Sequence, residues 1–113
     1  MNTPSSNERR DTERLPLRAY AELAHNLQRY EAHVLDISEQ GARIALLVDH
    51  NITTDHEFTL VLEPQDLPDI LSKYLPLTLT AKAVHIRQHI LGIRCSPLHD
   101  QDAKRFAKLL AQI

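Results

Sequence analysis

Arginine is concentrated at the start of the chain, where its spacing suits an anion. Six of the nine arginines lie in the first 43 residues, whereas the stretch 49–69 holds six acidic residues and no Lys or Arg. Arg10 and Arg14 form the pattern R-x-x-x-R, and Arg9 adds a guanidinium directly before it. The pattern alone is common in an arginine-rich chain, and Arg14 and Arg18 form a second match. A guanidinium pairs bidentately with phosphate or a purine edge, so we expect an anion site near the N-terminus.

A more selective pattern, D-x-S-x-x-G, is formed by Asp36, Ser38 and Gly41. In an extended chain, side chains two residues apart point to the same side, so Asp36 and Ser38 are expected to share one face. Gly41 permits a positive φ, or lets the backbone approach a ligand without a Cβ in the way. The pattern equally suits a turn at the end of a strand, with Asp36 and Ser38 bonded to local backbone. The motif therefore indicates either a ligand shelf or a structural turn.

Alternating apolar and polar residues predict the strands that position these motifs. Asn, Asp, Ser or Gly bound most of these segments, and Gly92 marks a bulge or a close backbone approach within the last one. The segments run over residues 15–24, 28–37, 42–48, 57–62, 77–87 and 89–95.

Two segments have helical rather than alternating spacing. The first precedes the fifth strand, with Asp66 as N-cap and Pro68 in the first turn, and we expect its apolar stripe to lie against the strands. The second closes the chain, with Ser96 or Asp100 as its cap. The first stripe consists of Leu67, Ile70, Leu71, Tyr74 and Leu75, and the second of Ala103, Phe106, Ala107, Leu110 and Ile113.

The length of 113 residues suits one domain. Residues 1–14 contain no aliphatic side chain after Met1 and are expected to form a flexible arm, followed by a domain over residues 15–113. The predicted fold is mainly β: a six-stranded antiparallel barrel with a short helix between strands four and five and a C-terminal helix. No apolar run is long enough to cross a bilayer, and no export signal precedes the domain, so we expect a cytoplasmic protein without membrane insertion.

Composition argues against several classes of function. A net charge of -2 and 4% aromatic residues disfavour a nucleic-acid binder. The pairs His85 with His89 and His50 with His56 lack a further ligand cluster, so we expect no metal, and Cys95 is expected to be a reduced, partly buried strand residue. No nucleophile motif or phosphate-binding loop is present, so we expect no catalytic residue and no enzyme.

The order of these features resembles the PilZ domain family over nearly the whole chain. R-x-x-x-R precedes the first predicted strand, and D-x-S-x-x-G falls between the second and third. The segments Arg14-Leu15-Pro16-Leu17, Gly41-Ala42-Arg43-Ile44 and Gly92-Ile93-Arg94-Cys95 resemble the family's first, third and last strands. The resemblance implies a bacterial receptor that binds the second messenger cyclic di-GMP and needs no other cofactor.

The resemblance also implies roles for individual residues. Arg10, Arg14, Asp36, Ser38 and Gly41 are the implied ligand-binding residues. His85 stands about where the family often carries a tryptophan, which makes it a second-tier contact, and Cys95 stands where phenylalanine is frequent. Arg9 suits a second molecule of a stacked ligand dimer.

Three functions follow as hypotheses from the sequence. The first is a cyclic di-GMP receptor or adaptor that changes its surface on binding and regulates an unidentified effector protein. The second is a ligand-independent interaction module that docks through the helix at residues 67–75. The third is a small barrel that binds RNA through residues 9–18, which the charge disfavours.

Overall fold

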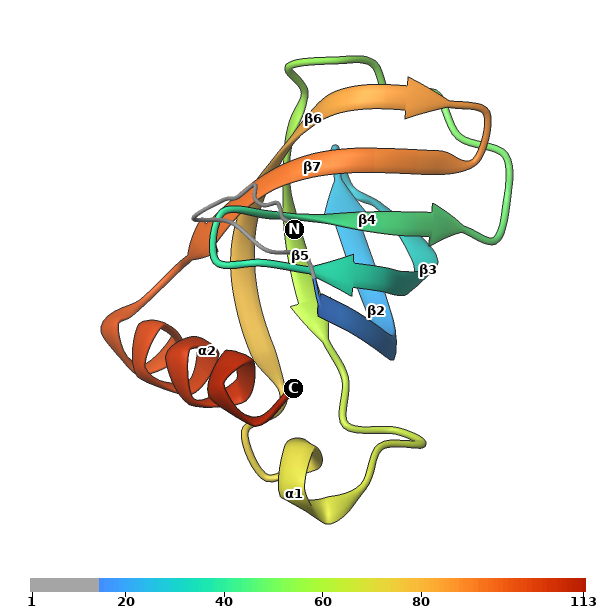
Figure 1. Ribbon diagram of the computed structural model, residues 1–113. Helices are drawn as coiled ribbons and strands as arrows, with labels where there is room; N and C mark the ends of the chain where they lie inside the picture. The colour runs from blue at the N-terminus through green and yellow to red at the C-terminus, as the bar shows by residue number, and fades with distance from the viewer. Residues whose placement is uncertain (1–14) are drawn as a thin grey trace, which may run out of the picture.

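The structure, a computed structural model, describes residues 15–113, so the predicted arm at 1–14 lies outside the described residues. The described part of the chain forms six strands and two helices (Figure 1). The strands are β2 (Leu15–His25), β3 (Gln28–Ile37), β4 (Gly41–Leu46), β5 (Glu57–Leu62), β6 (Leu77–Arg87) and β7 (Ile90–Pro97); the helices are α1 (Asp69–Ser72) and α2 (Asp100–Gln112). The predicted third strand was too long, because β4 ends at Leu46, and β7 runs past Cys95 to Pro97.

The six strands close into an antiparallel barrel in the order β2-β3-β4-β7-β6-β5. Along β3, Tyr30, Ala32 and Val34 are buried, and the residues between them are more exposed. This alternation follows from the two-residue period of a strand, which sends successive side chains to opposite faces. The predicted mainly β fold, with a short helix before the fifth strand and a helix at the C-terminus, is confirmed.

Aliphatic side chains fill the barrel. Burial of this apolar surface is the main force that favours the closed sheet. A barrel of this size is narrow enough for side chains to occupy its interior, so a ligand has to bind on the outer surface. The largest fully buried side chains are Leu23, Val34, Ile37, Ile44, Leu60, Leu62, Leu77, Leu79, Leu91 and Leu109.

Helix α1 is shorter than the sequence predicts, with a single turn between β5 and β6. The predicted N-cap, Asp66, lies outside it with φ 61°, and Pro68 occupies the N-cap position without a capping side chain. Leu71 is partly buried against the core and Leu75 is buried, as predicted for the apolar stripe. Ile70 is the exception, at 53% exposed. Most of the stripe therefore covers the barrel.

Helix α2 packs against β6 and β7 at one end of the barrel (Figure 1). Its N-cap is His99, neither Ser96 nor Asp100, and the Asp102 carboxylate accepts the His99 backbone N–H at 3.2 Å. Its buried face is also shifted from the prediction. Phe106 and Leu109 are buried and Leu110 and Ile113 are partly buried, whereas Ala103 and Ala107 are exposed.

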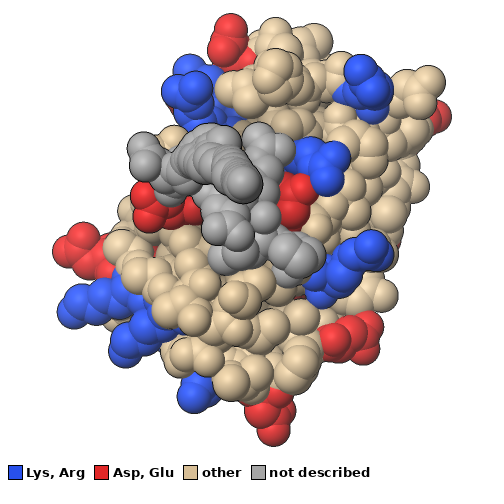
Figure 2. All heavy atoms as spheres, viewed as in Figure 1, with Lys and Arg blue, Asp and Glu red and all other residues tan. Residues whose placement is uncertain are grey.

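Neither helix in the described range is long and apolar enough to cross a membrane. On the face shown in Figure 2, Lys and Arg side chains are interspersed with Asp and Glu. A nucleic-acid binder normally presents a basic stripe instead, so the visible surface gives no support to the RNA hypothesis.

Candidate functional site

The D-x-S-x-x-G segment forms the tight connection between β3 and β4. The Ser38 backbone N–H donates to the Gly41 carbonyl at 2.7 Å, and the Ser38 hydroxyl accepts the Gly41 N–H at 3.2 Å. Ser38 is only 4% exposed. These bonds are typical of the structural turn, one of the two interpretations that the sequence allowed. In this arrangement the Ser38 hydroxyl is hydrogen-bonded to backbone groups.

Glycine is needed at position 41 for a different structural reason from the one expected. Neither glycine of the chain has a positive φ, so the left-handed geometry allowed for Gly41 is wrong. Instead, a Cβ at this position would lie 2.4 Å from the carbonyl oxygen of Ile93 on β7. Gly41 is therefore required by the close approach of two strands rather than by a special turn conformation.

Asp36 is paired with Arg43, a residue that was not predicted from the sequence as part of the site. The Nε of Arg43 donates to Oδ2 of Asp36 at 2.6 Å, across the β3–β4 pair. The side chain of Asp36 is 11% exposed and that of Arg43 is 52% exposed, so the guanidinium faces solvent while it orients the carboxylate. A hairpin that turns at residues 38–41 pairs position 36 with position 43. The position of the turn in the sequence could therefore have identified Arg43 as the partner of Asp36.

Backbone pairing extends this pair into a row across four strands. Asp36 is aligned with Arg43, Arg43 with Gly92, and Gly92 with His85. The register shifts between Ala83 and His85, so the bulge lies on β6, and Gly92 is the close approach that the sequence allowed. His85 is exposed, and its side chain lies against Gly92, where an added Cβ would be 3.3 Å from the His85 Cβ. The second-tier candidate thus shares a row with Asp36.

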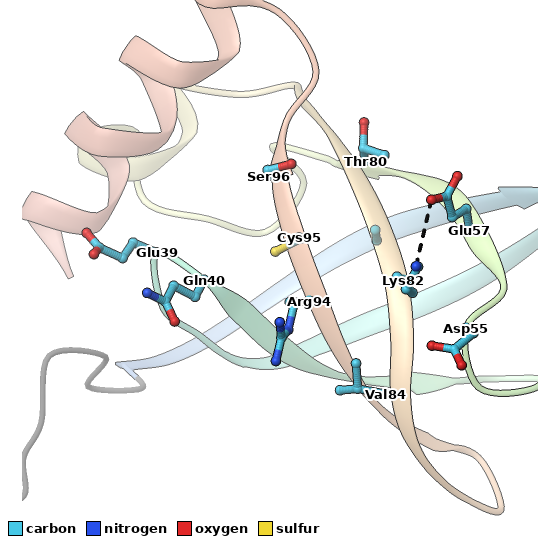
Figure 3. Close-up of a pocket in the computed structure, with 11 residues that line it drawn as sticks. Glu39, Gln40, Asp55, Glu57, Thr80, Lys82, Val84, Arg94, Cys95 and Ser96 are labelled. Carbon is cyan, nitrogen blue, oxygen red and sulfur yellow. Dashed lines mark ion pairs between the residues drawn. The ribbon is translucent and has the colours of Figure 1, made fainter.

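A groove of about 920 Å³ adjoins the motif on the outer surface of β6 and β7. Glu39 and Gln40 of the motif loop form one end of it, and Arg94 projects from β7 (Figure 3). The Gln40 carbonyl accepts the backbone N–H of Cys95 at 3.0 Å, which ties the loop to β7. Lys82, on β6, lies 4.0 Å from the carboxylate of Glu57. Neither Arg94 nor Lys82 was predicted from the sequence as a site residue, because strand alternation does not reveal which strands are neighbours.

The arginine motif cannot be placed in the same way. Arg9, Arg10 and Arg14 lie outside the described residues. Strand β2 begins directly after them, and its first two residues, Leu15 and Pro16, pair with Ile37 and Asp36. The point where the chain enters the barrel is therefore adjacent to the D-x-S-x-x-G segment, although far from it in sequence.

Chemically reactive groups are few around this surface. Cys95 is buried, and burial raises the pKa of its thiol from 9.0 to about 11, which keeps it protonated and weakly nucleophilic. Within residues 15–113, no group of three or more His, Cys, Asp and Glu is arranged to hold a metal ion. The arrangement presents carboxylate, guanidinium and backbone groups, which suit recognition of a polar ligand.

Comparison with known proteins agrees with this geometry. No curated protein matches the chain. The family model described as PilZ domain matches residues 8–112. The match includes both sequence motifs, all six strands and helix α2. The chain therefore belongs to the PilZ domain family.

Proposed function

We propose that this domain is a cyclic di-GMP receptor of the bacterial cytoplasm that regulates a partner protein. The family supports a cyclic di-GMP-binding domain. The observation that carries the proposal for this chain is the Asp36–Arg43 pair on the outer barrel surface, directly beside the start of β2. That position brings the second motif next to the place where the segment bearing the arginines joins the barrel.

The ligand's chemistry matches these groups. Cyclic di-GMP has two phosphodiester charges and two guanines, each with O6 and N7 acceptors on one edge and N1–H and N2–H donors on another. Arg10 and Arg14 suit the phosphates and the acceptor edge, because a guanidinium donates in a planar fork. Asp36 suits the donor edge, since an ionised carboxylate only accepts hydrogen bonds. Arg43 already holds one Asp36 oxygen at 2.6 Å and would keep the carboxylate oriented.

Ser38 and Gly41 enter the proposal chiefly as residues that shape the site. Their mutual hydrogen bonds and the close approach to Ile93 fix the turn that carries Asp36. His85 is proposed as a peripheral contact, because its exposed ring belongs to the same row. No catalytic role is proposed for any residue, and no cofactor is required besides the ligand.

The structural roles of Ser38 and Gly41 also favour a second candidate, a ligand-independent interaction module. Because both residues are explained by the turn alone, the motif would persist in a domain that binds nothing. The docking face first considered, the stripe at residues 67–75, is mostly packed on the core, which leaves Ile70 as its exposed member.

Calorimetric titration with cyclic di-GMP distinguishes the two candidates, with separate titrations of GTP and a short RNA as controls. We expect binding of cyclic di-GMP alone, weakened by about 1–3 kcal/mol in Arg10→Ala or Arg14→Ala, with unchanged melting temperature. Arg18→Ala is the matched control. Arg14 and Arg18 form the same R-x-x-x-R spacing as Arg10 and Arg14, but Arg18 lies within β2 rather than in the segment before it. Absence of cyclic di-GMP binding by the parent protein would favour the interaction module.

Stoichiometry is a separate part of the proposal. A stacked ligand dimer carries four phosphate charges, and Arg9 supplies an additional guanidinium for the second molecule. We expect titration to reach two ligands per chain and to fall to one in Arg9→Ala, with affinity that weakens as salt rises. A ratio of one in the parent protein removes the dimer and leaves the receptor assignment in place.

A further inference from the structure

The groove beside the motif contains a cross-strand pair of like charges. Arg94 on β7 and Lys82 on β6 are directly opposite in the antiparallel register. Both side chains point outward, because their neighbours Ile93, Cys95 and Ala81 are buried. Like charges directly opposite one another destabilise a sheet. Such an arrangement becomes favourable when an anion lies between or above the two cations.

Arg94 and Lys82 make few and weak interactions with other described residues. Within the part of the chain that the structure describes, Arg94 has no ion pair or hydrogen bond through its guanidinium, and the residue is exposed. Among residues 15–113, the Lys82 ammonium has an ion pair with Glu57 alone, at 4.0 Å, and these side chains are 44% and 73% exposed. Exposed pairs of this kind contribute little to stability. Both cations are therefore available to an incoming ligand without the loss of a strong contact.

The position of this pair connects it with the proposed ligand site. Gly41 of the motif is aligned with Arg94, and Arg94 with Lys82, in the row next to the one formed by Asp36 and Arg43. Neighbouring outward rows are two residues apart along a strand, or about 7 Å. Gly41 has no side chain to separate the two rows. One ligand can therefore contact Asp36 in the first row and Arg94 in the second.

We propose that Arg94 and Lys82 bind a phosphate of cyclic di-GMP, so that one guanylyl half of the ligand lies in the groove over β6 and β7. This inference rests on the proposed function. The Thr80 and Ser96 side chains on the same groove wall supply hydroxyls for the ribose or the base (Figure 3). Glu57, released from Lys82, restricts the groove to a ligand that also carries donors, because a bare polyanion meets its negative charge.

The test compares three alanine variants, each of which removes one positive charge from a different place on the barrel. Arg94→Ala is expected to weaken cyclic di-GMP binding about tenfold or more, as loss of a charge-assisted contact does. Lys82→Ala is expected to have a smaller effect in the same direction. Arg87→Ala is the control, since Arg87 lies on β6 at the β6–β7 hairpin and outside the groove. Melting temperatures of the three variants establish that each one folds.

The outcomes separate this inference from the proposed function. If the parent protein binds and Arg94→Ala binds as tightly as Arg87→Ala, the groove has no role and the receptor assignment stands. If the parent protein does not bind, the receptor assignment itself fails. Amide chemical shifts on titration give a second measurement. We expect changes at residues 80–82 and 94–96 as well as at 36–41, and changes confined to 36–41 would overturn the inference.

Discussion

Substitution of Gly41 by alanine tests whether the motif glycine is structural. The new Cβ would lie 2.4 Å from the Ile93 carbonyl oxygen, so these two atoms must separate by about 1 Å to reach van der Waals contact. The oxygen belongs to the backbone of β7 and cannot rotate away. Overpacking of this kind costs about 1–3 kcal/mol, and we expect the upper end of that range.

Gly92→Ala is the matched control for this substitution. Its Cβ would meet the Cβ of His85 at 3.3 Å, so the shift needed is a few tenths of an ångström, compared with about 1 Å for Gly41→Ala. Neither glycine has a positive φ, so both variants gain the same stabilisation, roughly 0.4–1 kcal/mol, from a less flexible unfolded chain. The difference between the two variants therefore isolates the clash.

Thermal and urea unfolding followed by circular dichroism measure that difference. At roughly 4 °C per kcal/mol for a domain of this size, Gly41→Ala should melt about 10 °C below Gly92→Ala. Equal melting temperatures would refute the close-approach explanation, and Gly41 would then have to be explained by ligand contact. Loss of cyclic di-GMP binding in Gly41→Ala is interpretable only at temperatures where the variant is folded.

Three further predictions concern the helices and the cysteine. Leu71→Ala should lower the free energy of unfolding by about 1–2 kcal/mol in urea titration, because Leu71 is only partly buried, whereas the exposed Ile70→Ala should be nearly neutral. Asp102→Ala should cost about 1–2 kcal/mol in the same assay, because its carboxylate accepts the backbone N–H groups of His99 and Thr78; no loss would show that water replaces both bonds. Burial raises the pKa of Cys95 from 9.0 to about 11, so the folded state favours the protonated thiol and stability should fall as pH rises between these values; in Cys95→Ala this part of the decline should disappear, and an unchanged pH profile would contradict the raised pKa.

The strands were predictable because burial imposes a period of two on the sequence. The bounds of β3, β5 and β6 agree with the alternating segments at 28–37, 57–62 and 77–87. Alternation identifies which side chains face outward but not which strands adjoin. Lys82 and Arg94 were therefore not predicted as residues of the candidate site, since their neighbours are set by the pairing of β4 with β7 and of β7 with β6. Arg43 differs, because the β3–β4 hairpin alone pairs it with Asp36.

The buried face of α2 shows a second limit of sequence patterns. A stripe through Ala103 and Ala107 and a stripe through Phe106 and Leu109 both have helical spacing. The barrel selects the second, because larger side chains bury more apolar surface against β6 and β7. Rotation of a helix about its axis is a property of tertiary packing, whereas the N-cap His99 is fixed locally by its contact with Asp102.

Closure of the barrel restricts how a partner protein can recognise this domain. Each of the six strands is hydrogen-bonded to a neighbour on both sides, with β2 and β5 completing the circle. No strand of residues 15–113 is left without a hydrogen-bonded neighbour on either side. Addition of a further strand along a complete free edge, a common mode of peptide recognition, is therefore disfavoured, as is edge-to-edge aggregation. In the proposed receptor, an effector would have to distinguish the ligand-bound domain through side chains and loops on its outer surface.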